Sequence, residues 1–195
     1  MKLILSFCIV LLHISNVFCQ EWTDEQLEKA NTAYDESYLS ESEKEAILYI
    51  NLCRLYPADF AAIELKDYDG LPNVRDKNLA KYKASLAAAL ATMKPCEPLK
   101  PDELLFDDAK CYGNEISKNK RKPHQRIDCM KRNYAECIYF GSGEGMHVAM
   151  QWLIDSGVES LGHRKICLSP ANRKIAVKIN PHFEYRFCAV AEFAK

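Results

Sequence analysis

Two stretches near the end of the chain constrain its fold more than any other sequence feature. In residues 175–179 apolar side chains alternate with others, which is typical of a half-buried β-strand, and residues 187–193 form a second strand candidate. Pro181 and His182 supply a turn between them, and the whole link is too short for a parallel crossover. The two strands are therefore expected to pair antiparallel.

The preceding part of the chain has a helical period. Ser40 and Glu43 form a capping box, which predicts a helix that starts at Ser40, and Pro57 suits the first turn of a short helix after it. Apolar residues at helical spacing predict three further helices, over about 79–93, 102–117 and 146–153. Helices followed by paired strands indicate an α+β domain with an antiparallel sheet.

Composition places the chain among ordinary globular proteins. It has 195 residues, 48% of them hydrophobic, and a formal net charge of -1. These values exclude collagen-like and disordered chains, and the length fits one domain with a sizeable core. The absence of a basic excess argues against a dedicated nucleic-acid binder.

The N-terminus has the pattern of a secretory signal peptide. Lys2 precedes a short apolar run, and Val17 and Cys19 fit the positions before a cut at Gln20. The run is too short to span a membrane, so an uncleaved anchor is the weaker interpretation. We expect a signal peptide over residues 1–19 and a secreted protein without a transmembrane segment. Residues 20–39 are expected to form an N-terminal extension or a short first helix.

Seven cysteines remain after the predicted cut: Cys53, Cys96, Cys111, Cys129, Cys137, Cys167 and Cys188. An odd number allows up to three disulfides, with one thiol left over or paired between chains. Proximity suggests Cys129 with Cys137, and the expected strand pairing suggests Cys167 with Cys188. No Cys-x-x-Cys occurs, so neither a zinc ribbon nor a redox motif has support.

Several short motifs follow one another from residue 124 to residue 194. They are Pro123-His124-Gln125, Tyr134-Ala135-Glu136-Cys137-Ile138, Gln151-Trp152-Leu153-Ile154-Asp155, Gly162-His163-Arg164, Ile175-Ala176-Val177 and Ala191-Glu192-Phe193-Ala194. Asn51-Leu52-Cys53-Arg54 precedes them in the first predicted helix. This order resembles the CAP superfamily of cysteine-rich secretory, antigen 5 and pathogenesis-related proteins, and is closest to its microbial-type Gly-His-Arg members.

The resemblance implies a CAP domain, also called an SCP domain, over residues 40–195. Its expected fold is a three-layer α-β-α sandwich with a central antiparallel sheet and a cleft on one side. The resemblance also implies a secreted protein that is monomeric or weakly dimeric.

Members of this superfamily often present two histidines and two acids in the cleft. Carried over by motif order, these are His124, Glu136, Asp155 and His163. Asp155 is shorter than the usual acid at its position, and the Gly-Glu-Asn motif reads Ala135-Glu136-Cys137. These departures concern the detailed geometry of the cleft and leave the four ionisable groups in place.

The residue types themselves indicate which chemistry such a cleft supports. Two neutral imidazoles, those of His124 and His163, bind a divalent cation through ring nitrogens, with zinc as the best match. Nearby carboxylates complete the metal shell or orient the imidazoles. The same groups also suit general acid–base catalysis. No His-Glu-x-x-His and no Gly-x-Ser-x-Gly motif is present.

Each of the four residues also has a structural interpretation. In these interpretations His124 is a surface residue, and His163 is a residue at a helix start or turn. Glu136 is a buried acid that accepts backbone hydrogen bonds. Asp155 caps the loop that follows it.

Other residues compete for the same roles. Glu159 is a rival for the second acid, whereas His147 and His182 are expected at the edge of the core or at the surface. Trp152 is expected to pack in the core. These alternatives stay open at the level of sequence.

Three functions fit these features. The first is a non-enzymatic extracellular binding or effector module whose ligand is a lipid, a sterol, a divalent metal or another protein. The second is a secreted metal-assisted or acid–base peptidase that uses the same cleft. The third is a defence or toxin-like protein that the basic residues of 118–122, Lys131 and Arg132 steer to acidic partners or membranes.

Overall fold

The computed structural model describes residues 21–118, 124–130 and 132–195. The expected signal peptide, its cut at Gln20, residues 119–123 of the basic cluster and Lys131 lie outside the described residues.

A four-stranded sheet forms the centre, in the order β1-β3-β4-β2. Strands β3 (Lys174–His182) and β4 (Arg186–Ala194) form the expected antiparallel hairpin, and β2 (Ala135–Gly141) pairs antiparallel with β4. The two-residue β1 (Lys100–Pro101) runs parallel to β3. The sheet is therefore mixed, and the expectation of a purely antiparallel sheet was wrong at this edge. The length of β1 explains the miss, because two residues carry no alternation.

Seven α-helices and one π-helix make up the rest of the described fold. They are α1 (Asp24–Ala30), α2 (Glu41–Leu55), α3 (Pro57–Phe60), η1 (Ala61–Leu65, the π-helix), α4 (Leu79–Leu90), α5 (Glu103–Ser117), α6 (Gly145–Ile154) and α7 (Gly162–Cys167). Helices α2 to α6 agree with the sequence prediction within a few residues at each end. Among the described residues, no single helix is long and apolar enough to cross a membrane.

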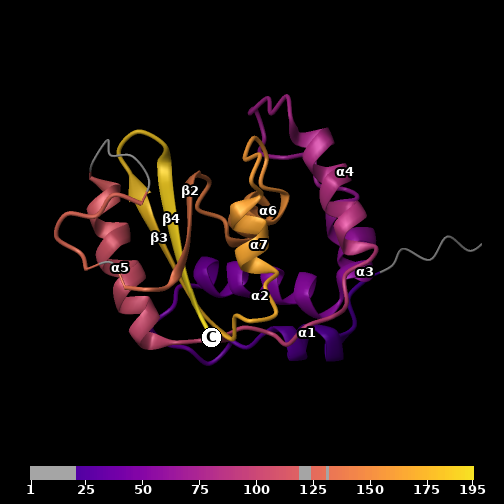
Figure 1. Cartoon of the computed structure of the whole chain (residues 1–195), viewed down its shortest axis with the longest axis horizontal. Helices are drawn as coiled ribbons and strands as arrows, with labels where there is room; N and C mark the ends of the chain where they lie inside the picture. The colour runs from indigo at the N-terminus through magenta and orange to yellow at the C-terminus, as the bar shows by residue number, and fades with distance from the viewer. Residues whose placement is uncertain (1–20, 119–123, 131) are drawn as a thin grey trace, which may run out of the picture.

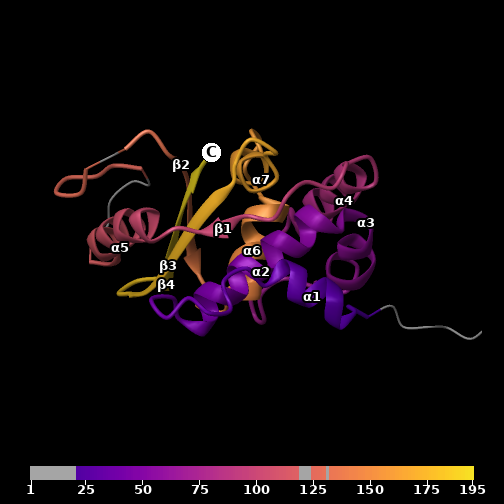
Figure 2. The same ribbon diagram turned by 90° about the horizontal axis from the view of Figure 1, so that it is seen from below.

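Helices cover both faces of the sheet. Helix α5 packs against β3 and β4 on one face, whereas α2 packs against β3, and α6 and α7 against β2, on the other (Figures 1 and 2). Helices α1, α3 and α4 lie outside α2 and α6, away from the sheet. The arrangement is α+β, as predicted.

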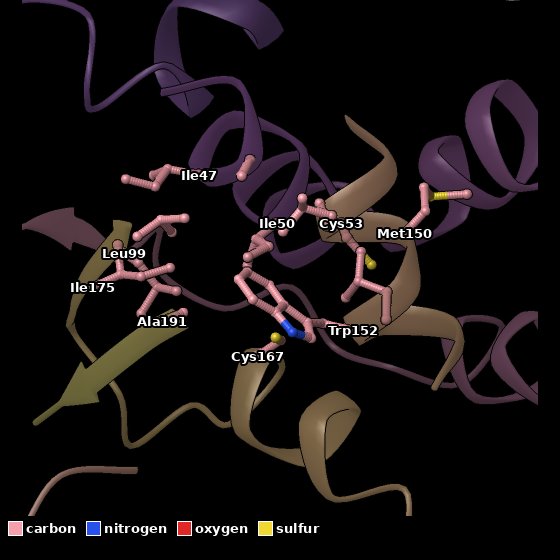
Figure 3. Close-up of a cluster of buried hydrophobic side chains, with 14 of the residues drawn as sticks. Ile47, Ile50, Cys53, Leu99, Met150, Trp152, Cys167, Ile175 and Ala191 are labelled. Atoms are coloured by element: carbon pink, nitrogen blue, oxygen red, sulfur yellow. The ribbon is translucent and has the colours of Figure 1, made fainter. Parts of the chain in front are cut away.

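Two apolar clusters occupy the two faces, because successive side chains of a strand point to opposite sides. The smaller cluster joins α5 to Ile138, Cys188 and Val190 of the sheet. The larger one surrounds Trp152 of α6 and includes residues of α2, α7 and the strands (Figure 3). The structure thus separates the sheet side chains into an α5 side and an α6 side.

The predicted capping box at the start of α2 is confirmed. The Ser40 hydroxyl accepts the Glu43 N–H, and the Glu43 carboxylate accepts the Ser40 N–H at 2.8 Å. The other Glu43 oxygen accepts Lys178 Nζ and the Ile179 N–H, both at 2.9 Å. A local helix cap therefore also fastens α2 to β3.

The Asn51-x-x-Arg54 motif of α2 is structural. Both side chains are fully buried. The Arg54 guanidinium donates to the carbonyls of Glu97, Cys167, Ser169 and Asn172 at 2.7–3.0 Å. Because backbone carbonyls satisfy these donors, Arg54 connects the end of α2 to the segments after α4 and α7.

Gly145 sets the distance between α6 and α2. A Cβ atom at this position would lie 2.1 Å from the Ser42 carbonyl oxygen and 2.6 Å from the Ala46 nitrogen. Only glycine allows so close an approach of the two helices. Helix α6 also contacts β2, and Asp155 is at its C-terminal end.

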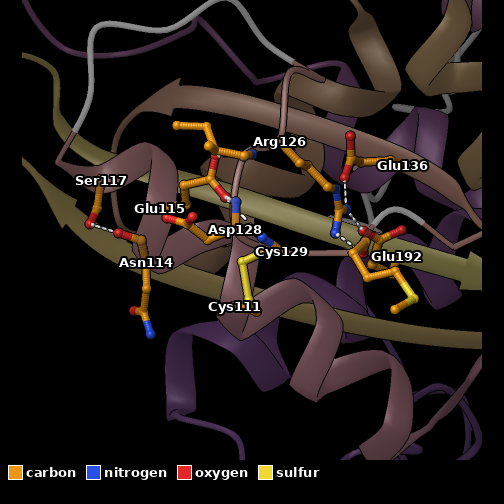
Figure 4. The surroundings of a disulfide bond; sticks show 11 residues. Cys111, Asn114, Glu115, Ser117, Arg126, Asp128, Cys129, Glu136 and Glu192 are labelled. Atoms are coloured by element: carbon orange, nitrogen blue, oxygen red, sulfur yellow. Dashed lines mark hydrogen bonds and ion pairs between the residues drawn. A yellow bond between two sulfur atoms is a disulfide. The ribbon is translucent and has the colours of Figure 1, made fainter.

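One disulfide is present among the described residues, and it joins Cys111 of α5 to Cys129 (Figure 4). Neither expected pair forms, so both predictions were wrong. Cys129 is committed to Cys111, and Cys137 faces the α6 side of the sheet. Cys167 and Cys188 cannot meet, because they belong to clusters on opposite faces.

Glu115 reinforces the attachment that the disulfide makes. Its carboxylate accepts the N–H groups of Ile127, Asp128 and Cys129 at 2.8–3.2 Å. The segment 124–130 is therefore held on α5 by a covalent bond and by a helix side chain. This attachment brings His124 and Arg126 to the end of β2.

Candidate functional site

A cleft of about 340 Å³ opens along the edge strand β2. Consecutive β2 residues line it from both faces of the sheet, and α6, α7 and the segment around His124 supply the rest. The lining residues are His124, Ile138, Tyr139, Phe140, Gln151, Trp152, Asp155, Ser156, Val158 and His163. The cleft therefore lies where the α5 side and the α6 side of the molecule meet.

The first histidine–acid pair comes from the α5 side. His124 Nδ1 lies 2.7 Å from Glu136 Oε1, with 43% of the histidine side chain and 4% of the glutamate side chain exposed. His124 has a left-handed backbone, with a φ of 67°. When the ring is neutral and Nδ1–H donates to the carboxylate, the lone pair is on Nε2.

The second pair comes from the α6 side. His163 Nδ1 lies 2.8 Å from Asp155 Oδ1, and Asp155 Oδ2 accepts the N–H groups of His163 at 2.9 Å and Arg164 at 3.2 Å. Asp155 ends α6 in the left-handed region and caps the first turn of α7. One buried carboxylate thus satisfies backbone donors and orients the imidazole.

Arg126 holds the acid of the first pair. Its guanidinium donates to both Glu136 and Glu192, and Figure 4 shows it between the two carboxylates. The two glutamates are register partners on β2 and β4, so they point to the same face. The Arg126 guanidinium also lies 4.2 Å from the centre of the Tyr112 ring on α5.

The two carboxylates have opposite pKa shifts. Burial and the neighbouring Glu136 carboxyl raise the pKa of Glu192 to about 8. Burial also acts to raise the pKa of Glu136, but hydrogen bonds with His124, Glu192 and Arg126 outweigh it and lower the pKa to about 2. Glu136 is therefore the ionised partner and Glu192 the protonated one at neutral pH.

The structure pairs the four residues that the sequence singled out. His124, Asp155 and His163 line the cleft directly, and Glu136 lies behind His124 as its hydrogen-bond partner. Asp155 also has a structural role, although it caps α7 and not the loop that follows α6.

The rival residues lie elsewhere. Glu159 is exposed and does not line the cleft. His147 contacts Tyr68 and Glu144, and His182 is buried at the end of β3, where its Nδ1 accepts two N–H groups of the turn. Trp152 packs in the core, as expected, and also forms a wall of the cleft.

Sequence reasoning missed Arg126 and Glu192. Glu192 had a usable signal, since it is the one charged residue in the predicted strand 187–193. Arg126 had none, because it lies in an irregular segment whose position depends on the disulfide and on Glu115.

Comparison with known proteins adds no family assignment. No protein-family model matches the chain, and no curated protein matches it. Among the described residues, no group of three or more histidine, cysteine, aspartate or glutamate side chains is arranged to hold a metal ion. The ionisable groups of the cleft are two separate histidine–acid pairs.

Proposed function

We propose that the chain is a secreted CAP-domain protein that acts as a non-enzymatic extracellular binding module. In this proposal His124 and His163 bind a divalent cation, zinc by preference, in the cleft beside β2. The order of the sequence motifs supports the CAP assignment. The helices on both faces of the sheet are compatible with its α-β-α sandwich.

One observation carries the metal proposal: both imidazoles at the cleft have a carboxylate on Nδ1. In metal sites this hydrogen bond fixes the tautomer, orients the ring and makes Nε2 a stronger ligand. Glu136 and Asp155 are themselves occupied by these bonds, by Arg126 and by backbone N–H groups. They suit the orienting role better than direct coordination.

Two protein ligands leave most of the metal's coordination positions to water or to a bound molecule. Structural zinc sites have four protein ligands and catalytic ones usually three. We therefore expect an exchangeable cation. Ile138, Phe140 and Val158 give the cleft apolar walls, which suit a partly apolar ligand such as a lipid, a sterol or a protein side chain.

Calorimetric titration of the folded chain with zinc tests the proposal. We expect one binding event for the wild type and at least about tenfold weaker binding for His124→Ala and for His163→Ala. His147→Ala is the matched control, because His147 lies on α6, which also lines the cleft, but bonds to Tyr68 and Glu144 outside the cleft. The control should bind zinc within about twofold of the wild type.

Cobalt(II) identifies the ligand type in the same proteins. Imidazole coordination gives weak visible bands without the strong near-ultraviolet band of a cobalt–thiolate bond. Equal heats for the wild type and both cleft variants, or a thiolate band that persists in them, would reject the histidine site.

A further inference from the structure

Two buried thiols lie behind the cleft. Cys137 follows Glu136 on β2, so its side chain points to the opposite face, toward α7. Cys167 is the last residue of α7. Both residues are fully buried, and the Cys167 thiol is close enough to help raise the pKa of the Cys137 thiol.

The backbone geometry brings the same two residues together. Cys137 Sγ lies 3.9 Å from the carbonyl oxygen of His163. In an α-helix this carbonyl faces the amide of the residue four positions later, which is Cys167. Several Cα atoms of β2 and α7 also lie within 8 Å of one another. Neither element has to move far for the two sulfur atoms to meet.

We propose that Cys137 and Cys167 form a second disulfide, which joins β2 to α7 behind the cleft. The free thiols of these two residues in the structure are its reduced form. The proposal does not depend on metal binding. It concerns the same region, because α7 carries His163 and β2 carries Glu136.

The bond forms by exchange with a small-molecule disulfide such as glutathione disulfide. One cysteine thiolate attacks a sulfur of the oxidant, breaks its S–S bond and releases one thiol as the mixed disulfide forms. The second cysteine thiolate then attacks the protein sulfur of that mixed disulfide and releases the second thiol. Two electrons and two protons pass from the protein to the oxidant.

The reaction belongs to folding and not to the folded state. Burial, with a contribution from the Cys167 side chain, raises the pKa of the Cys137 thiol well above its usual value. A buried thiol with so little thiolate reacts slowly. Closure must therefore precede the packing of α7 on β2, and the folded reduced protein is expected to resist oxidation.

Two other free thiols could compete or serve as a control. Cys53 is buried in the same cluster, and Figure 3 shows it together with Cys167 in the core around Trp152. Cys188 lies on the α5 side of the sheet, where its thiol donates to the Gly113 carbonyl. Cys53 is the competitor of Cys137, whereas Cys188 is a buried thiol with the sheet between it and Cys167.

The decisive experiment is a peptide map. The full chain is refolded in a glutathione redox buffer, free thiols are alkylated, and the digest is analysed without reduction. We expect peptides containing Cys137 and Cys167 to be crosslinked, in addition to Cys111 with Cys129. Alkylated Cys137 and Cys167, or a bond from Cys167 to Cys53, overturns the proposal. This result needs no variant.

Thermal unfolding of Cys137→Ser measures the effect of the bond. After oxidative refolding we expect its Tm to be roughly 5–10 °C below that of the wild type. After refolding under reducing conditions the difference should shrink to the cost of burying a hydroxyl. Cys188→Ser should show the same Tm difference under both conditions. An equal redox response of the two variants contradicts the proposal.

Discussion

Each of the two histidine–acid pairs contains the same kind of hydrogen bond, between imidazole Nδ1 and a carboxylate oxygen. The pairs differ in what holds this bond in place. Asp155 and His163 are eight residues apart, and the carboxylate also caps the helix that carries the imidazole. His124 and Glu136 belong to an irregular segment and to a strand, and Arg126 connects them to Glu192, which lies far along the chain. The Asp155–His163 pair is local, whereas the His124–Glu136 pair depends on the tertiary fold.

This difference has energetic consequences. Backbone N–H groups that a buried carboxylate satisfies need no second charge, so the Asp155 pair tolerates changes elsewhere. Glu136 and Glu192 instead form a buried carboxylate pair that one guanidinium compensates. Removal of a single partner from such a group leaves an uncompensated buried charge. The comparison predicts that the Asp155–His163 pair is robust to substitutions elsewhere and that the His124–Glu136 pair is sensitive to them.

The largest effect is expected for Arg126→Met. The substitution keeps much of the side-chain volume but leaves the two glutamates facing each other. We expect the free energy of unfolding at neutral pH to fall by about 3–5 kcal/mol. Urea unfolding followed by circular dichroism measures this change.

Arg132→Met is the matched control for this prediction. Arg132 bonds to Asp108 at 3.0 Å, but 57% of its side chain is exposed. Its substitution should change stability by less than about 0.5 kcal/mol. Addition of Glu136→Gln to Arg126→Met should recover part of the loss, because it removes the carboxylate that is ionised at neutral pH. If Arg126→Met lost no more stability than Arg132→Met, Arg126, Glu136 and Glu192 would not stabilise the fold as one group.

Asp155→Ala should have an intermediate effect. The change removes the cap of α7 and the partner of His163, and it places alanine in the left-handed region, where Asp155 has a φ of 57°. We expect a loss of about 2 kcal/mol, again from urea unfolding.

Asp155→Asn separates the two contributions. Asparagine tolerates the left-handed backbone and keeps one acceptor oxygen, so the loss should be about half as large. If the local pair is independent of the other one, the imidazole NMR signals of His124 stay in place in both variants. A shift of His124 comparable with that of His163 would contradict this independence.

The same contrast explains what the sequence could predict. The capping box of Ser40 and Glu43, the hairpin of β3 and β4, and the amphipathic helices follow from patterns within a few residues of one another. Asp155 and His163 belong to this class, since their pairing spans a single turn between helices. The motif order could assign these two residues because their pairing does not depend on contacts between distant parts of the chain.

The features that sequence reasoning missed depend on long-range pairing. Strand β2 was not predicted, although its register on β4 is what places Glu136 beside Glu192. The disulfide predictions relied on proximity along the chain and on the expected strand pairing, whereas Cys129 is bonded to Cys111 of α5 and Cys188 lies in the cluster on that side of the sheet. Arg126 reaches its partners only because the disulfide and Glu115 hold its segment in position.

The smallest effect is expected from the pH response of Glu192→Gln. The folded-state pKa of Glu192 is about 8, above the value of about 4.3 in an unfolded chain. Between these values the folded state keeps a proton that the unfolded state releases, so this residue makes stability fall as pH rises. Glu136 has the opposite shift, and its contribution is already complete above about pH 5.

Glutamine cannot titrate, so the variant should lack this fall. We expect the wild type to lose about 1 kcal/mol relative to Glu192→Gln between about pH 5.5 and pH 6.5, measured by urea unfolding at each pH. A difference that stays flat would mean that Arg126 keeps both carboxylates ionised. The His124–Glu136 pair would then be held by charge alone, without the protonated Glu192 that distinguishes it from the Asp155–His163 pair.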